Sequence, residues 1–233
     1  MDAGTMAKLL EFARAGGTHA FVVHKPYRSH RITSGSEFGP SFRVTADLAR
    51  SAGEGSGVRT FAAVGPYPVD YIRLSERLGP ARAEEAMLEG MEEAGRMVEE
   101  GAAQAIGEIG RPHFEVEPEV REASNRILLE GMRIAARVGC PVVLHTETAT
   151  PDVCADLASI ADRAGLARER VVKHYSPPLV DVSLNAGLFP SVLASGSSVV
   201  EAARQGTRFM METDYLDDPR RPGAVMGPRT VPR

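Results

Sequence analysis

The amino-acid sequence predicts an α/β fold in which strands and helices alternate along the whole chain. Short apolar runs of strand length lie between longer amphipathic stretches that have a helical period. Several helix-like stretches end at a glycine that the next apolar run follows closely, as expected where a left-handed residue terminates a helix. This order predicts a parallel sheet covered by helices, either closed into a barrel or open and doubly wound.

The apolar runs are expected to form strands, and several of them are rich in β-branched residues. Each is too short for a helix of ordinary length and follows a turn-like or glycine-containing segment. The expected strands are 20–23, 58–64, 103–109, 140–144, 171–172, 188–193 and 209–211.

The stretches between these runs are expected to be helices. The clearest start is Thr150-Pro151-Asp152, where a threonine caps the helix and proline occupies its first position. The expected helices are 5–15, 41–52, 81–100, 116–138, 151–164, 177–185 and 195–205.

Length and composition indicate one globular domain over 1–233, with a Pro/Arg-rich tail at 217–233 that is expected to form loop. Hydrophobic residues make up 43% and charged residues 25%, which argues against disorder. The net charge of −4 disfavours nucleic-acid binding through a broad basic surface. Without a long apolar run, a basic leader or more than two cysteines, the sequence predicts a cytoplasmic protein with no membrane contact.

Four of the expected strands end at a residue that can bind a metal ion. These are Glu108, His145, His174 and Asp214, at intervals of 37, 29 and 40 residues. Each interval fits about one strand–helix–strand unit, so right-handed crossovers would bring all four to the same edge of the sheet. A lone histidine at a strand end is more often structural, but four such residues at equivalent positions favour one shared site.

Two imidazoles and two carboxylates suit a divalent metal, and one or two ions of Zn, Mn, Mg, Fe or Co are expected. A metal there would activate water and polarise a phosphoryl or carbonyl oxygen. Glu108 and Asp214 are the expected catalytic carboxylates, because a carboxylate beside the metal can accept the proton of the water.

Other polar residues near the same edge are candidates for substrate binding. For His24, a loop hydrogen bond is the more common role. Glu147 follows His145 by two residues, so it could instead orient a ligand. The candidates are His24, Lys25, Arg111, His113 and Glu147.

At these residues the sequence resembles the TatD-related metal-dependent hydrolases of the amidohydrolase-like TIM-barrel superfamily. The resemblance rests on five segments that occur in the family's order, from about Ala15 to Tyr215. They are AGGTHAFVVHKP, GEIG with Glu108, PVVLHTE with His145, VKHYS with His174 and METD with Asp214.

The resemblance implies a (β/α)8 barrel with a two-metal site that hydrolyses phosphoester bonds, typically as a deoxyribonuclease. Glu108 would bridge the metals, His145 and His174 would hold one of them, and Asp214 would bind the other and accept a proton. Small phosphoesters or DNA ends are the expected substrates. No stable protein partner is evident, and a homo-oligomer is compatible with the sequence.

The family carries an HxH motif on its first strand, and none of the 233 residues forms one. The resemblance therefore implies an incomplete barrel that lacks the first strand and the last helix, with the Glu108 metal keeping its ligands. Three alternatives stay open: an amidohydrolase or lactonase acting on a small molecule, a catalytically impaired barrel that binds metal without turnover, and a truncated gene product.

Overall fold

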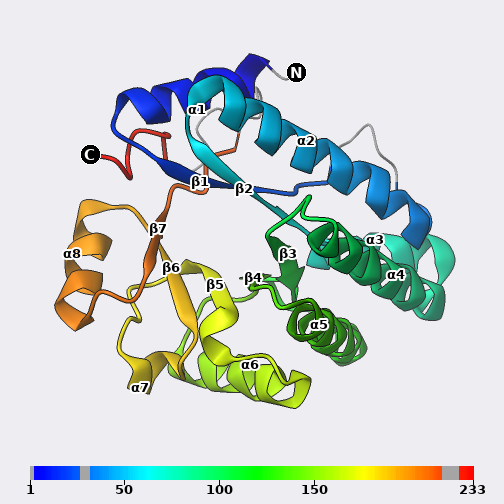
Figure 1. The fold of residues 1–233 in the computed structure, drawn as a ribbon. Coiled ribbons are helices and arrows are strands. Elements are labelled where there is room, and N and C mark those ends of the chain that lie inside the picture. The colour runs from blue at the N-terminus through cyan, green and yellow to red at the C-terminus, as the bar shows by residue number, and fades with distance from the viewer. Residues whose placement is uncertain (1–2, 27–31, 217–225) are drawn as a thin grey trace.

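The computed structural model describes residues 3–26, 32–216 and 226–233, and it shows one sheet of seven parallel strands (Figure 1). All seven strands expected from the sequence are present. They are β1 (His19–Val23), β2 (Arg59–Val64), β3 (Ala105–Gly110), β4 (Val142–His145), β5 (Val171–Ser176), β6 (Phe189–Leu193) and β7 (Met210–Glu212).

The strands lie in the same order in the sheet as in the sequence, β1 to β7. A doubly wound sheet would reverse its order at a switch point, so the sequential order identifies an incomplete TIM-like barrel. The described chain opens on helix α1 (Ala3–Arg14) and not on a strand, as the sequence predicted. Within the described residues, β1 pairs with β2 and β7 pairs with β6, and no pairing joins β1 to β7.

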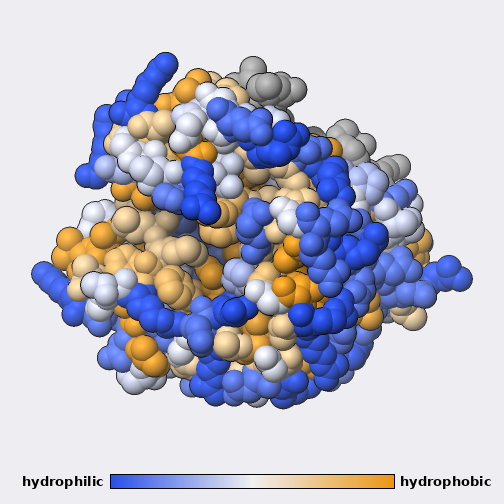
Figure 2. All heavy atoms as spheres, viewed as in Figure 1, coloured by the Kyte–Doolittle hydropathy of each residue, from blue (hydrophilic) through white to orange (hydrophobic). Residues whose placement is uncertain are grey.

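The helices surround the strands, with α2 above them in Figure 1, α4 and α5 to the right, α6 below and α8 to the left. Figure 2 shows strongly hydrophilic side chains over the outer helices on the right and more apolar ones toward the middle of this face. Besides α1 the helices are α2 (Phe38–Ser56), α3 (Pro68–Leu78), α4 (Pro80–Glu99), α5 (Pro118–Val138), α6 (Pro151–Ala164), α7 (Val182–Asn185) and α8 (Gly196–Gln205), with short 3-10 helices at Gly35–Glu37 and Arg168–Arg170.

The helix predictions were wrong in two places. Helix α3 was not expected, although Pro68 at its first position and Gly79 directly after its end were available signals. The expected helix at 177–185 is reduced to the single turn α7, because Pro177 and Pro178 have no N–H to donate within a helix. The remaining differences are shifts of a few residues at helix ends.

The main hydrophobic core lies between the sheet and helices α2 to α6. Aromatic residues of α2 pack there against methionines of α4, and β3 contributes Ile106 and Ile109. Gly131 of α5 allows this close packing, since a Cβ there would lie 2.9 Å from Met91 Sδ and 3.0 Å from Ile109 Cδ1. Helices α2 to α6 therefore cover the sheet on its outer face.

The last described segment of the chain lies against helix α1, close to β1 and β7 (Figure 1). Arg229 Nε lies 2.9 Å from Glu11 Oε1 of α1, and Lys8 Nζ lies 5.7 Å from the centroid of the Tyr215 ring. Residues 226–233 form turns, while residues 217–225 of the expected tail lie outside the described residues. Among the described helices, none is long and apolar enough to cross a membrane.

Asp70, in the first turn of α3, makes the stability of the fold depend on pH. Burial raises the pKa of this carboxyl from 3.8 to about 6, although Arg73 and the Tyr67 amide oppose the shift. Because the folded state disfavours the ionised form, the stabilisation that Asp70 provides is present below pH 4 and is lost as the pH rises through about 6.

We expect Asp70→Asn to match the wild type in unfolding free energy near pH 4 and to exceed it by up to about 3 kcal/mol at pH 7. Urea denaturation at pH 4, 5, 6 and 7 measures this difference. Glu76→Gln, at an exposed position of the same helix, is the control. A difference that stays constant over this pH range would contradict the expectation.

Candidate metal centre

The ends of three neighbouring strands bring one carboxylate and two imidazoles together. Glu108 comes from β3, His145 is the last residue of β4, and His174 lies in β5. One ligand atom from each lies within 4.8 Å of the others. Three of the four metal ligands expected from the sequence are therefore in one cluster.

Irregular strand pairing directs two of these side chains. In the register of β3 with β4, Gly107 pairs with Val143 and Ile109 pairs with Leu144, so Glu108 is the extra residue of a β-bulge. The pairing of β5 with β6 is also irregular, between Lys173 and Ser176, the segment that contains His174. Bulges commonly redirect a side chain next to an active site.

The carboxylate of Glu108 lies between the two imidazoles. Its Oε2 is 3.4 Å from His145 Nδ1, and its Oε1 is 3.4 Å from His174 Nε2. The two imidazole rings are stacked, with centroids 5.8 Å apart. Two ligands at about 2.05 Å from a tetrahedral ion would be separated by roughly 3.3 Å, so the observed spacing fits a shared divalent cation.

The charges around Glu108 keep it ionised and ready to bind a cation. Burial raises the pKa of this carboxyl, but the hydrogen bond with His145 and the charges of His174, His145 and Lys25 outweigh burial, and the pKa is lowered overall. Metal ligation requires a deprotonated carboxylate. The environment of Glu108 meets that requirement.

A second carboxylate, Glu212 of β7, fixes the orientation of His174. Its Oε1 lies 2.9 Å from His174 Nδ1 and accepts the backbone N–H of Tyr175 at 3.0 Å, while Ser191 donates its hydroxyl to Oε2. Burial lowers the pKa of His174, but Glu212, Glu108 and Asp214 raise it to about 9. With Nδ1 facing Glu212, Nε2 is directed toward Glu108, the usual arrangement of a metal-bound histidine.

Glu212 was missed in the sequence, although one signal pointed to it. It precedes Asp214 by two residues, and a strand extended to Asp214 would have placed both on the same face.

His145 also has an outer pair of partners, Tyr67 and His113. Its Nε2 lies 3.2 Å from the Tyr67 hydroxyl and 2.9 Å from His113 Nδ1. Burial and the charges of Glu108 and Asp70 raise the pKa of Tyr67 to about 12, so its phenol stays neutral. Tyr67 immediately precedes α3, so it was missed together with that helix. His113 lies beside His145 and is exposed to solvent.

Asp214 lies at the margin of the cluster. Its Oδ1 is 4.0 Å from His174 Nε2, its side chain is 38% exposed, and its backbone is left-handed with a φ of 47°. Burial, together with the charges of Glu108 and Glu212, raises the pKa of Asp214 despite the opposing effect of His174. The structure therefore places Asp214 next to the three-residue cluster and not within it.

Lys25 and His24 follow β1 but have different surroundings. Lys25 is exposed, and its positive charge lowers the pKa values of both Glu108 and Asp214, so it lies near the cluster. His24 is buried, with Nδ1 2.9 Å from Thr45 Oγ1 and its ring against Phe42 of α2. The expected substrate contact does not fit the position of His24, because strand alternation turns it to the helix side of the sheet.

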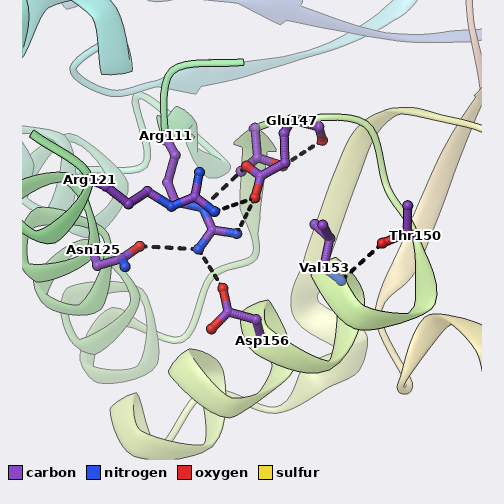
Figure 3. Close-up of polar contacts among 8 residues, drawn as sticks. Arg111, Arg121, Asn125, Glu147, Thr150, Val153 and Asp156 are labelled. Carbon is purple, nitrogen blue, oxygen red and sulfur yellow. Dashed lines mark hydrogen bonds and ion pairs between the residues drawn. The ribbon is translucent and has the colours of Figure 1, made fainter. Parts of the chain in front are cut away.

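Arg111 and Glu147 contact each other in the loops that follow β3 and β4 (Figure 3). The Arg111 side chain is buried, because Glu147, Asn125 and Asp156 surround its guanidinium. An expected substrate contact therefore does not fit Arg111. Glu147 accepts hydrogen bonds from Arg111 and Arg121.

The chain forms an incomplete TIM-like barrel, and a carboxylate and two imidazoles that could hold a metal ion lie at the carboxyl ends of its strands. These features define the class of metal-dependent hydrolases of the amidohydrolase superfamily. The TatD related DNase family matches residues 5–233, and the chain belongs to this family. It is also 33% identical over 223 residues to the uncharacterized protein MJ1127 of Methanocaldococcus jannaschii, covering 95% of this chain and 77% of that protein.

Solved structures share the fold at lower sequence identity. A TatD-like protein from Archaeoglobus fulgidus matches with a TM-score of 0.62 and 18% identity, covering 90% of this chain and 80% of that one. The phosphotriesterase homology protein from Escherichia coli, solved with phosphate in its active site, matches with a TM-score of 0.60 and 13% identity, covering 95% and 76%. These likenesses confirm the barrel architecture expected from the sequence.

We expect Glu212→Gln to weaken divalent-metal binding by roughly 10- to 100-fold, because the amide is a weaker acceptor for the His174 N–H. Competition with a coloured chelator measures the Kd for Zn²⁺ or Mn²⁺. Glu201→Gln, at an exposed position of α8, is the control and should keep the wild-type Kd. An unchanged Kd in a folded Glu212→Gln protein would show that this carboxylate does not support the centre.

Proposed function

We propose that the protein hydrolyses phosphodiester bonds, with small phosphoesters or DNA ends as substrates, using a divalent metal held by Glu108, His145 and His174. The observation that carries this proposal is the convergence of three ligand atoms within 4.8 Å in a chain of the TatD related DNase family. The net charge of −4 favours a small or terminal substrate over a long nucleic-acid track.

A metal ion bound there would supply Lewis-acid activation of water and neutralise charge on the phosphate oxygens. The chain supplies the remaining chemistry. Asp214 has a raised pKa and lies 4.0 Å from His174, at the edge of the ligand cluster, where it can accept the proton of an attacking water. Lys25 and His113 are exposed beside the cluster and can contact the anionic phosphate.

Hydrolysis of bis(p-nitrophenyl) phosphate with added Mn²⁺ or Zn²⁺ tests this proposal. We expect turnover in the wild type and a loss of at least roughly 100-fold in kcat/KM for Glu108→Gln, because the variant lacks the carboxylate between the two imidazoles. Glu201→Gln is the control and should keep full activity.

Two results would contradict the proposed hydrolysis of phosphodiesters. Turnover of a lactone or an amide but of no phosphodiester would favour a small-molecule amidohydrolase or lactonase. Metal binding that depends on His145 and His174, without turnover of any ester, would favour a catalytically impaired barrel.

The role of Asp214 can be separated from metal binding. We expect Asp214→Asn to lower kcat by about 100-fold or more, since a general base typically contributes that much, while the Kd of the metal at Glu108, His145 and His174 changes little. Steady-state kinetics and metal titration on the same preparation measure both quantities. A parallel loss of metal and activity would instead make Asp214 a ligand.

A further inference from the structure

Arg111 is a fully buried cation directly after β3. Its side chain is 1% exposed and is the largest of the fully buried side chains in the described part of the chain. Its backbone N–H donates to the carbonyl oxygen of His145 at 3.0 Å. The end of β4, which carries the metal ligand His145, is therefore hydrogen-bonded to the residue that follows β3.

The Arg111 side chain also binds the loop after β4, at Glu147, two residues beyond His145. Its Nε donates to Glu147 Oε2 at 3.3 Å and its Nη2 donates to Glu147 Oε1 at 2.7 Å. Arg121 of α5 also donates to Glu147 Oε1, at 2.6 Å. Figure 3 shows both guanidinium groups converging on this carboxylate from the side of α5.

The remaining guanidinium nitrogen of Arg111 binds the two helices that flank the loop. Its Nη1 donates to Asn125 Oδ1 of α5 at 3.2 Å and to Asp156 of α6. Arg111 thus ties the loop after β3, the loop after β4, α5 and α6 to one rigid, planar group. Two arginines and two carboxylates make the cluster neutral.

A buried ionic cluster is weak evidence for stability, because apolar residues of similar volume often stabilise a fold as well or better. The cluster also has a geometric effect, since Arg111 alone holds the segment from His145 to Glu147 through one backbone and two side-chain hydrogen bonds. Outer contacts of this kind commonly change metal affinity by roughly 10- to 100-fold.

We propose that Arg111, acting through Glu147, is a positioning residue for the metal centre: it fixes the loop after β4 so that His145 Nδ1 stays directed at Glu108. This inference rests on the metal-binding part of the proposed function. It does not depend on which bond the protein hydrolyses.

Two variants separate positioning from simple stabilisation. Glu147→Gln weakens the Arg111 contact to the loop that carries His145. Asp156→Asn weakens the contact on the opposite side of the same guanidinium, at a side chain that is 53% exposed and belongs to α6. The readouts are the Kd of Co²⁺, the visible absorption spectrum of bound Co²⁺, and the Tm of the metal-free protein.

We expect Glu147→Gln to raise the Kd by roughly 10- to 100-fold and to change the Co²⁺ spectrum, because the position of His145 changes. We expect both variants to lower the Tm of the metal-free protein to a similar extent. Asp156→Asn should nevertheless keep the wild-type Kd and Co²⁺ spectrum. Arg121→Gln, which removes one bond to Glu147 from a partly exposed side chain, should give a smaller change in the same direction. It provides the test if Glu147→Gln does not fold.

Wild-type Kd and spectrum in folded Glu147→Gln and Arg121→Gln would overturn the inference. Equal losses of affinity in Glu147→Gln and Asp156→Asn would also overturn it, since affinity would then follow stability. Absence of Co²⁺ binding in the wild type would remove the metal centre and with it both proposals. Metal binding without phosphodiester turnover would remove the proposed substrate alone.

Discussion

The arrangement of the centre depends on one constraint: the negative carboxylate of Glu108 must be held between two imidazoles at the ends of adjacent strands. A carboxylate taken out of water is costly unless cationic or hydrogen-bonding groups compensate it. The parallel register provides that compensation, because β4 and β5 follow β3 directly in the sheet and bring His145 and His174 to the same edge. The β-bulge at Glu108 then directs its side chain to the point between them.

The two histidines are supported from outside in different ways. His174 faces a carboxylate, Glu212, which is itself held by Ser191 and the Tyr175 amide, so the ring is oriented through its own nitrogen. His145 has Tyr67 and His113 as outer partners, and its backbone carbonyl oxygen accepts the N–H of Arg111. His174 is thus oriented by a charged side chain, and His145 is held through its own backbone.

Much of this was accessible from the sequence, because it is encoded locally. The apolar runs located all seven strands, and the metal-binding residue types at the carboxyl-terminal parts of β3, β4 and β5 identified Glu108, His145 and His174. The less accurate assignments involved partners distant in sequence. Asp214 was predicted from its place after the last expected strand and Glu212 was missed, but Glu212 lies at the shorter distance from His174. Arg111 was predicted as a candidate substrate contact. The sequence did not show that it is buried, because its burial depends on two helices and a loop that pack around it.

The sequence by itself determined the alternation of strands and helices, the parallel direction of the strands, and the residue types gathered at their ends, since these follow from hydrophobic period and spacing. The hydrophobic period and spacing left open a barrel and a doubly wound sheet, although the family resemblance already implied an incomplete barrel. Tertiary structure decided between them through the order of the strands. It also decided which carboxylate faces His174 and which arginine is withdrawn from solvent. The physical reason is that strand order, register shifts and loop packing depend on contacts between residues far apart in the chain, which a local pattern does not encode.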